Sequence, residues 1–572
     1  MTKLVKNKSL KEEEAMENIL KKSYKMFING EWVNSSNGIM VKTYAPYNNE
    51  LLSEFPDASE SDVDLAVKSA KEAFKTWRRT TVKERAKILN KIADIIDTNK
   101  DLLATVETMD NGKPIRETTS VDIPLAATHF RYFAGCILAD EGQATILDEK
   151  FLSIILKEPI GVVGQIIPWN FPFLMAAWKL APALAAGDTV VLKPSSSTTL
   201  SLLVLMELIQ NVIPKGIVNL ITGKGSTAGE FLKNHPDLDK LAFTGSTAVG
   251  RDIALAAAEK LIPATLELGG KSANIILDDA DIEKALEGAQ LGILFNQGQV
   301  CCAGSRIFVQ EGIYDEFIKK LIKKFENIKI GNPLDPTTVM GSQIDARQVK
   351  TILDYVEIAK QEGGTILTGG VKYTENGCDK GNFVRPTLIT NVKNTCRVSQ
   401  EEIFGPVAVV IKFKTDDEVI AQANDSEYGL GGAVFTKNIN RALRLAREIQ
   451  TGRVWINTYN QIPEHAPFGG YKKSGIGRET HKVILEHYSQ MKNILIDLSD
   501  DVSGFLSNPM EHAEASKMAL FSVADYTWNM KAYDADRAWE GAVRELYPHS
   551  TEAFRHFAQD NVDPGANDIA SD

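Results

Sequence analysis

The sequence predicts an α/β protein of two or three domains. Its 572 residues, 62.9 kDa, exceed what one compact core organises. Residues 161–267 alternate short apolar, β-branched segments with helical ones, and a second alternation of this kind follows from residue 278. Short apolar strands separated by helices are typical of parallel sheets covered on both faces. We therefore predict a parallel, doubly wound sheet in the first part and a second α/β domain after it.

Helical spacing marks the region before the first alternation. From Val63 onward, apolar side chains recur at the spacing of one helix face, and Ser61 is a candidate N-cap. We predict helix from Ser61 to Leu103. Residues 146–172 alternate apolar with polar residues and then become an apolar, β-branched run, which predicts strands.

The two alternations contain well-separated elements. The predicted strands of the first are GVVGQIIPW, DTVVL, IVNLITG, KLAFTG and ATLELGG, with helical segments between them. The second begins with the helical segment DDADIEKALEGAQLGIL, followed by the strand RIFVQ, the helix YDEFIKKLIKKFENI and the strand VAVVIKF. Two α/β domains of this kind fit the length of the chain.

Composition excludes several classes of protein. The first 25 residues are charged throughout and lack the apolar run of a secretion signal, and no stretch approaches the roughly 18 apolar residues of a membrane span. Five cysteines without a framework spacing predict reduced thiols and a cytoplasmic location. The eight histidines show no metal-ligand spacing, so we expect no metal site.

The net charge of −11 is concentrated near the C-terminal end. Residues 499–572 contain 14 acidic and 5 basic residues, whereas the preceding 498 contain 61 acidic and 59 basic. Binding to nucleic acid needs a basic surface, so the near-neutral body predicts no such partner. The shift in composition near residue 498 predicts a domain boundary.

Two strand–glycine–helix units are candidate phosphate sites. Free backbone N–H groups and the helix dipole at the start of a helix favour an anion. Gly245 and Ser246 occupy the turn in KLAFTGSTAVGRDIALA, and Gly223, Gly225 and Gly229 lie in IVNLITGKGSTAGEFL. Neither segment reads GxGxxG, so each is equally explained as a tight connection.

Three other residues suggest chemistry, each with a purely structural alternative. Asn170, in the turn IIPWNFP at a predicted strand end, could donate to an oxyanion or only form the turn. Glu267, at the end of a strand in LELGGKSANII, could be a general base or pair with a lysine. Cys301, in FNQGQVCCAGSR, could be an exposed nucleophile or a packed thiol.

Together and in this order, these segments resemble the aldehyde dehydrogenase superfamily over roughly residues 20–497. The motifs that carry the resemblance are IIPWNFP, FTGSTAVG, LELGGKSANII, FNQGQVCCAGSR, EEIFGPV and PFGGYKKSGIGRE. LELGGK together with GQVCCAGSR is highly specific. The nearest resemblance is to bacterial NAD-dependent enzymes that act on simple aliphatic aldehydes.

The resemblance implies oxidation of a small-molecule aldehyde to a carboxylic acid through a cysteine thiohemiacetal and a thioester. Cys301, the third residue after the glycine of GQ, would be the nucleophile, and Asn170 with the backbone N–H of Cys301 would hold the oxyanion. Glu267 would activate water and Glu479 would assist proton removal. Cys302 is expected to be a packed neighbour, and a reversible disulfide with Cys301 is the alternative.

The resemblance also implies a dinucleotide site. Gly245, Ser246 and Val249 would lie near the pyrophosphate, Lys193 near the adenine ribose, and Glu402 with Phe404 near the nicotinamide ribose. The other implied contacts are Ile167, Pro168, Trp169, Ser196, Gly225 and Leu268. Many NAD-preferring relatives have Glu where this chain has Ser196, and a serine neither holds the ribose hydroxyls nor repels a 2′-phosphate strongly. We expect NAD as the cofactor, with NADP left open.

The fold implied has a Rossmann-like dinucleotide-binding domain, a catalytic domain and a small β extension for oligomerisation, so we expect a homotetramer or homodimer. The dinucleotide-binding domain would take residues 20–142 and 161–267, and the catalytic domain residues 268–482. Residues 143–160 and 483–497 would supply the oligomerisation strands. Four aromatic residues are candidates for an apolar access path, namely Phe171, Trp178, Tyr459 and Phe468.

Residues 499–563 resemble a C-terminal piece of the catalytic barrel of bacterial β-N-acetylglucosaminidases of the hyaluronidase and O-GlcNAcase type. The resemblance is strongest in SNPMEHAEASKMALFSVADYTWN, where Asn508 matches a sugar-binding asparagine. A working glycosidase needs two carboxylates and a complete barrel, and the paired aspartates of that family lie upstream of this piece. We predict that residues 499–572 are a non-catalytic appendage, partly helical or disordered. Two alternatives stay open: a carbohydrate-binding or glycosidase-related fusion with the body as scaffold, and a body whose assembly the tail disrupts.

Overall fold

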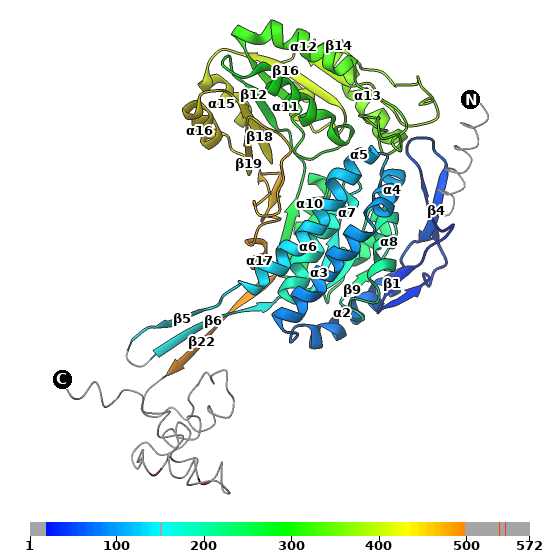
Figure 1. The fold of residues 1–572 in the computed structure, drawn as a ribbon, viewed down its shortest axis with the longest axis vertical. Coiled ribbons are helices and arrows are strands. Elements are labelled where there is room, and N and C mark those ends of the chain that lie inside the picture. Colours follow the sequence, from blue (N-terminus) through cyan, green and yellow to red (C-terminus); the bar gives the residue numbers. More distant parts are fainter. Residues whose placement is uncertain (1–18, 149–150, 498–536, 538–543, 545–572) are drawn as a thin grey trace, which may run out of the picture. The chain divides into compact units, whose positions relative to one another are not determined.

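The computed structural model describes residues 19–148, 151–497, 537 and 544. The described residues fall into two units, the first formed by residues 19–140 and 158–490 and the second by the rest. Apart from positions 537 and 544, the predictions for residues 499–572 lie outside the described residues. The fold class predicted from the sequence, α/β, is confirmed (Figure 1).

The first unit contains a mixed sheet in the order β2–β1–β9–β8–β7–β10–β11–β21. The five central strands, β9, β8, β7, β10 and β11, are parallel, as predicted. At the two edges β1, β2 and β21 pair antiparallel. The prediction of an all-parallel sheet is therefore wrong at its edges. The strands are β1 Met26–Ile28, β2 Glu31–Val33, β7 Val162–Ile166, β8 Thr189–Lys193, β9 Val218–Leu220, β10 Lys240–Thr244, β11 Ala264–Glu267 and β21 Gly475–Ile476.

The antiparallel edge at β1 and β2 has a local cause that the sequence displays. Asn29 and Gly30 join the two strands with φ values of 55° and 76°. A two-residue hairpin loop of the favoured type needs positive φ at both positions, which Asn and Gly adopt most readily. The dipeptide Asn-Gly was thus a hairpin signal.

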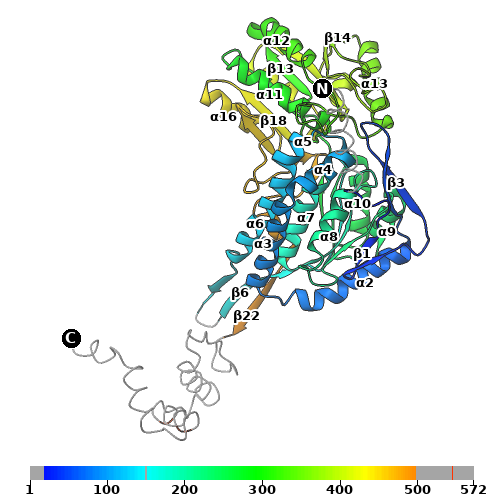
Figure 2. The same cartoon turned by 45° about the vertical axis from the view of Figure 1, so that its right-hand side comes forward.

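Helices cover both faces of the first sheet, as Figures 1 and 2 show from two sides. On β8, Val190 and Leu192 pack into the core beneath α3, α6, α7 and α8, while Val191 packs into the opposite core with α2, α9 and α10. This alternation follows from the two-residue period of a strand. The helices are α2 Glu60–Trp77, α3 Val82–Thr98, α4 Lys100–Asn111, α5 Ile115–Glu117, α6 Ile123–Leu138, α7 Pro172–Ala186, α8 Leu200–Ile209, α9 Glu230–Asn234, α10 Thr247–Glu259 and α17 Ile484–His487.

The single helix predicted from Ser61 to Leu103 is wrong, because α2, α3 and α4 share this span. Ser59, not Ser61, caps α2, and its side chain and that of Asp62 form a capping box. Thr81 begins α3 with a second capping box. A capping box satisfies the free N–H groups at a helix start, so each one marks a new helix.

The second sheet also lies in the first unit, in the order β14–β15–β16–β13–β12–β18–β19. All neighbours are parallel except β14 and β15. Its strands are β12 Ala273–Ile276, β13 Arg306–Gln310, β14 Thr365–Thr368, β15 Thr387–Thr390, β16 Val407–Phe413, β18 Gly431–Phe435 and β19 Arg453–Ile456. Its helices are α11 Ile282–Leu294, α12 Tyr314–Glu326, α13 Ala346–Gln361, α14 Arg397–Gln400, α15 Asp416–Asn424 and α16 Ile439–Glu448.

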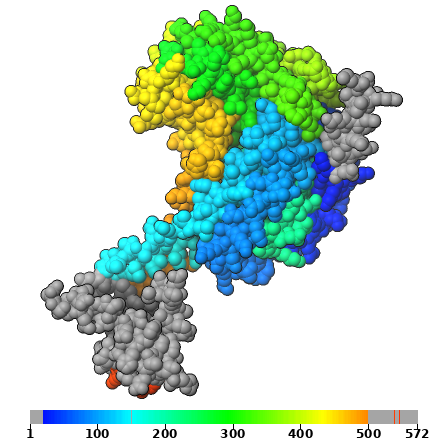
Figure 3. Space-filling view, in the orientation of Figure 1, coloured from blue at the N-terminus to red at the C-terminus, as the bar shows by residue number. Residues whose placement is uncertain are grey.

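The residues around the second sheet meet those of the first-sheet helices within the same unit. In the space-filling view, the green to yellow part of the chain adjoins the blue and cyan part (Figure 3). At one such contact, the backbone N–H of Ile115 in α5 donates to the carbonyl of Pro333 at 2.8 Å. Two small antiparallel pairs complete the unit: β3 Met40–Tyr44 with β4 Leu51–Pro56, and β17 Tyr428–Gly429 with β20 Tyr471–Lys472.

A three-stranded sheet in the order β22–β6–β5 lies mostly in the second unit. Its strands are β5 Gln143–Ile146, β6 Phe151–Pro159 and β22 Ser489–Asp497. The strand predicted from residue 483 therefore begins only at Ser489, because α17 precedes it. In the described part of the chain, no helix is long and apolar enough to cross a membrane.

Three neighbouring parallel strands of the first sheet end at the same edge. β7 ends at Ile166, β10 at Thr244 and β11 at Glu267. In open α/β sheets the crevice outside the carboxyl ends of the strands binds ligands. The segments that follow these strands therefore mark the place to look for a site.

Candidate active site

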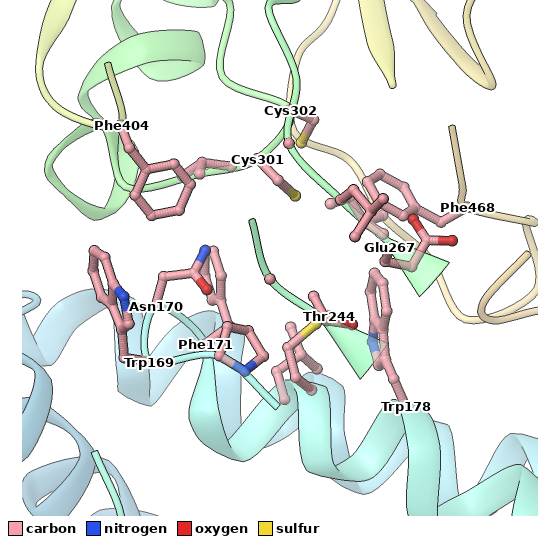
Figure 4. A pocket seen from close by; sticks show the side chains of 18 of the residues that line it. Trp169, Asn170, Phe171, Trp178, Thr244, Glu267, Cys301, Cys302, Phe404 and Phe468 are labelled. Carbon is pink, nitrogen blue, oxygen red and sulfur yellow. The ribbon is translucent and has the colours of Figure 1, made fainter. Parts of the chain in front are cut away.

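A cavity of about 270 Å³ lies at this edge of the first sheet. The turn after β7, the ends of β10 and β11, and the loop between α11 and β13 all contribute to its wall. Asn170, Glu267 and Cys301 line it together, and Figure 4 shows Cys301 on the wall opposite Asn170, with its sulfur directed into the space between the walls. The structure thus brings three of the four predicted catalytic residues into one cavity.

The loop that carries Cys301 has an unusual backbone. Asn296, Gln297 and Gly298 have φ values of 45°, 56° and 75° within η3, the 3₁₀ turn Phe295–Gly298. At Gly298 a Cβ would lie 2.2 Å from the carbonyl carbon of Gly405, so this position excludes any side chain. Such a loop holds Cys301 in one place against the cavity.

The resting Cys301 thiol is not an acidic one. Its contact with the Cys302 side chain and its burial raise its pKa well above the usual value, and the charges of Glu402 and Glu267 act in the same direction. Because the thiolate is the nucleophile, attack on a substrate requires removal of this proton. Cys302 itself is buried, with its Sγ 3.9 Å from Asn460 Oδ1.

Asn170 presents a free amide hydrogen to the cavity. Its Nδ2 donates one hydrogen to the backbone carbonyl of Gln299 at 2.9 Å, which leaves the second N–H of that nitrogen for a ligand. The carbonyl of Asn170 accepts hydrogen bonds from the side chains of Asn296, at 2.8 Å, and Asn111, at 3.4 Å. The side chain and the backbone of Asn170 are therefore both held by neighbours.

Glu267 is a buried carboxyl without a hydrogen-bond partner. Only 4% of the residue is exposed, and neither carboxyl oxygen has a partner within the described residues. Burial, followed by the charge of Glu479, raises its pKa well above the usual value. A carboxyl with a raised pKa and a free oxygen in a cavity has the properties of a general acid or base.

Glu479, the fourth predicted catalytic residue, lies behind the cavity and not on its wall. It forms an ion pair with Lys179 of α7, and both side chains are fully buried. Its backbone pairs with that of Phe468, whose ring lines the cavity. The sequence prediction missed Lys179, although a single lysine inside the apolar segment FPFLMAAWKLAPALAAG signals a buried charged partner.

Seven of the predicted cofactor contacts line the cavity, namely Pro168, Trp169, Gly245, Ser246, Leu268, Glu402 and Phe404. The rings of Trp169 and Phe404 meet edge-to-face, with centroids 5.2 Å apart. Glu402 accepts a hydrogen bond from the backbone N–H of Gly270 at 3.0 Å, and burial raises its pKa to about 7.

The other five predicted cofactor contacts lie outside this cavity. Ile167 and Lys193 are buried, Gly225 and Val249 are exposed, and Ser196 lines a separate cavity of about 650 Å³ with Lys224 and Arg347. Ser246 caps α10, and Val249, 45% exposed, belongs to its first turn. The first turn of α10 is therefore exposed, although the Val249 N–H already donates to Ser246 Oγ at 3.4 Å. An exposed helix start suits a phosphate.

Three of the four aromatic candidates line the cavity and the fourth does not. Phe171, Trp178 and Phe468 contribute to its wall. Tyr459 is packed on Trp455, and its hydroxyl donates to the carbonyl of Cys302 at 3.0 Å, so it supports the loop from behind. In the described residues, no group of three or more His, Cys, Asp or Glu side chains could hold a metal ion.

Comparison with known proteins agrees with this geometry. Residues 32–494 match the sequence model of the aldehyde dehydrogenase family. The chain is 50% identical over 492 residues to aldehyde dehydrogenase B of Escherichia coli K12, covering 85% of this chain and 96% of that protein. Residues 478–559 also match the model of a β-N-acetylglucosaminidase family.

Solved structures agree as well. A putative aldehyde dehydrogenase from Burkholderia cenocepacia superposes with a TM-score of 0.83 at 42% identity, covering 85% of this chain and 100% of that one. An NAD+ complex of an aldehyde dehydrogenase from Bacillus cereus gives 0.83 at 43% identity, covering 85% and 99%. The chain therefore belongs to the aldehyde dehydrogenase family and is an enzyme of aldehyde oxidation.

Proposed function

We propose that the chain oxidises an apolar aldehyde to the carboxylic acid with NAD, using Cys301 as nucleophile, Asn170 as oxyanion donor and Glu267 as general base. One observation carries the proposal: a single cavity contains a projecting thiol, a free amide N–H and a carboxyl without a partner. The aromatic side chains in its wall favour an apolar substrate.

The first half-reaction needs the thiol and the amide. The sulfur of Cys301, once deprotonated, attacks the carbonyl carbon, and the carbonyl oxygen becomes an alkoxide. The second N–H of Asn170 Nδ2 and the backbone N–H of Cys301 donate to that oxygen. NAD, when bound, would supply the hydride acceptor. As the alkoxide electron pair re-forms the carbonyl and the hydride leaves, the carbon attached to the sulfur of Cys301 becomes the acyl carbon of a thioester.

The second half-reaction needs the carboxylate of Glu267. This group takes a proton from water, the oxygen attacks the thioester carbon, and the sulfur of Cys301 leaves as the acid forms. The charges of Lys179 and Glu479 act on Glu267 in opposite directions, the lysine lowering and the glutamate raising its pKa. The buried pair behind the cavity thus adjusts the proton affinity of the base.

We propose that NAD lies across the carboxyl edge of the first sheet, in a dinucleotide-binding domain of residues 20–142 and 161–267, with residues 268–482 as the catalytic domain. The exposed start of α10 would take the pyrophosphate, and Glu402 with Phe404 would border the nicotinamide ribose. Lys193 would lie near the adenine ribose. The cavity that contains Ser196 also contains Lys42, Lys224 and Arg347, so we propose that NADP is accepted less well but measurably.

An aldehyde panel measured with both cofactors tests the proposal. We expect short aliphatic aldehydes to be oxidised with a higher kcat/KM for NAD than for NADP. Ser196→Glu should lower kcat/KM for NADP by about 10-fold or more and change that for NAD by little, because the carboxylate repels a 2′-phosphate. Ser23→Glu adds the same charge at another exposed position as a control. A large preference of the unmodified enzyme for NADP would contradict the choice of NAD.

We propose that the second unit supplies an oligomerisation surface and that the enzyme is a cytoplasmic homodimer or homotetramer. In its described strands and turns, large apolar side chains lie exposed, with Ile146 74%, Met491 81% and Leu495 55% accessible. Exposed apolar residues on edge strands favour association with another chain.

We propose that residues 499–572 take no part in catalysis. The match of residues 478–559 to the β-N-acetylglucosaminidase family supports a common origin with part of a glycosidase, and it also favours the alternative of a carbohydrate-binding or glycosidase-related fusion. Among the described residues, those that line the cavity all lie between residues 121 and 468, which supports the first proposal.

Truncation after Leu498 tests the role of the tail. We expect the shortened chain to keep kcat for aldehyde oxidation within about 3-fold, because the described residues that line the cavity all lie before the truncation. Size measurement of both chains shows whether the tail affects assembly. A gain of oligomer and activity on truncation would support the disruptive tail, and hydrolysis of a chromogenic N-acetylglucosaminide by the full chain would support the glycosidase-related alternative.

A further inference from the structure

Asn296 links the two walls of the proposed oxyanion site. It is fully buried in the loop before Cys301, and its φ of 45° is in the left-handed region, which Asn tolerates better than most residues. Its Nδ2 donates to the carbonyl of Asn170 at 2.8 Å and to the carbonyl of Gln299 at 3.3 Å. The same Gln299 carbonyl accepts the hydrogen bond from Asn170 Nδ2.

These hydrogen bonds connect Asn170, Asn296 and Gln299 in a closed ring that includes the side-chain amide of Asn170. The turn with Asn170 follows β7, and the loop with Asn296 and Gln299 precedes β13, so they reach the cavity from different sheets. The direction of the free N–H of Asn170 depends on where the Gln299 carbonyl lies, because that carbonyl holds the other hydrogen. Asn296 ties this carbonyl and the Asn170 backbone to one side chain.

Asn296 is itself anchored from the opposite side. Its backbone N–H donates to Glu117 Oε2 at 3.0 Å, and Glu117 is buried at the end of α5. Burial raises the pKa of Glu117 to about 8, and the hydrogen bond from the Asn296 N–H acts against this shift because it favours the charged form of the carboxyl. Asn111, at the end of α4, adds a donor to the carbonyl of Trp169 at 2.7 Å. Both anchors come from the segment next to α6, outside the reacting atoms.

We propose that Asn296, anchored by Glu117, is a positioning residue that aims the amide N–H of Asn170 at the substrate oxyanion. The inference rests on the proposed role of Asn170. Asn296 does not line the cavity, so it acts through Asn170 and the Gln299 carbonyl. Its loss removes one of two donors from each carbonyl, since Asn111 still donates to the Asn170 carbonyl and Asn170 Nδ2 to the Gln299 carbonyl. The Asn170 amide is then held by fewer contacts and its direction is less fixed.

The test is a double-mutant cycle on steady-state kinetics. Asn296→Gly keeps the positive φ and the backbone N–H to Glu117. It removes the side-chain donors together with Oδ1, which accepts from Gln297 Nε2 at 3.4 Å. We expect kcat to fall about 10-fold or more, with KM for the aldehyde changed by less than about 3-fold, because the amide contacts the oxyanion mainly in the transition state. Asn170→Ala should lower kcat by about 10²–10³. In the Asn170→Ala enzyme, Asn296→Gly should have almost no further effect.

Asn391→Gly is the matched control. Asn391 also has a positive φ, 61°, and its Nδ2 donates to Thr365 Oγ1 at 3.0 Å. Asn391 does not line the cavity. It should leave kcat unchanged. If Asn296→Gly fails to fold, Asn296→Asp replaces the donor by an acceptor at nearly constant shape and should lower kcat at least as much. If Asn296→Gly slows the Asn170→Ala enzyme as much as it slows the unmodified enzyme, the positioning role of Asn296 is wrong, but the proposed role of Asn170 stands. If Asn170→Ala leaves kcat unchanged, both the positioning role of Asn296 and the proposed oxyanion donor are wrong.

Discussion

Replacement of Cys301 by serine is expected to lower kcat for aldehyde oxidation on the order of 10³-fold or more. The serine hydroxyl is far less acidic than a thiol and forms its nucleophilic anion much less readily. The structure adds a reason, because contact with Cys302 and burial already hold the pKa of the Cys301 thiol high. The same surroundings would disfavour an alkoxide still more. Production of the reduced cofactor, followed by absorbance, measures the effect.

Cys302→Ser is the matched control for this experiment, because it makes the same substitution one residue away. Cys302 is 1% exposed, and its Sγ contacts both Asn460 and the Cys301 thiol. Serine keeps a hydroxyl of similar size at this position, so kcat should stay within about 3-fold of the unmodified enzyme. Consecutive Cα atoms lie about 3.8 Å apart, shorter than the usual span of a disulfide. Peroxide inactivation and its reversal by thiol should therefore be the same in Cys302→Ser. Loss of kcat in Cys302→Ser but not in Cys301→Ser would reverse the assignment.

Replacement of Glu267 by glutamine is expected to separate the two half-reactions. The amide cannot accept a proton from water, so the thioester should accumulate on Cys301. A rapid-mixing experiment should show a burst of one reduced cofactor per active site, followed by a steady state slower by about 10²–10⁴. If the burst disappears together with the steady state, Glu267 deprotonates the thiol and not the water.

The pH dependence should change in the same variant. Burial and the charge of Glu479 raise the pKa of Glu267, so in the resting enzyme the protonated form, which cannot act as a base, is favoured up to a higher pH. Thioester hydrolysis should therefore speed up as pH rises through this pKa, and Glu267→Gln should lose that rise. Glu107→Gln is the control, because Glu107 is also fully buried and its pKa is raised to about 7, yet it does not line the cavity.

Several parts of the fold followed from local sequence. The strands RIFVQ and VAVVIKF begin and end where predicted, since a short β-branched run between polar boundaries specifies a strand locally. The helix boundaries between residues 61 and 103 were recoverable from two capping boxes, at Ser59 and Thr81, that the periodicity alone did not reveal. The edge strand β21 was not recoverable, because Gly475 and Ile476 pair with β11 from more than 200 residues away.

The residues of the candidate site also fall into those that the sequence predicted and those that it did not. Asn170, Glu267 and Cys301 were named from the sequence because each stands in a motif whose residue types suit one step of the chemistry. Lys179 left a visible signal, a charge in an apolar helix. Asn296 and Glu117 were not predicted from the sequence, because their roles depend on a contact between α5 and a loop 179 residues later in the chain.

The sequence alone was sufficient for the fold class and the family resemblance, and it supplied the candidates for nucleophile, oxyanion donor and base, because these depend on residue type within short motifs. The tertiary structure decided which predicted cofactor contacts share one cavity, that Glu479 lies behind it with Lys179, and that Tyr459 supports the loop instead of lining the cavity. It also decided how the Asn170 amide is held. Such facts depend on hydrogen bonds and burial between segments that are distant in the chain, and no local pattern of residues encodes those distances.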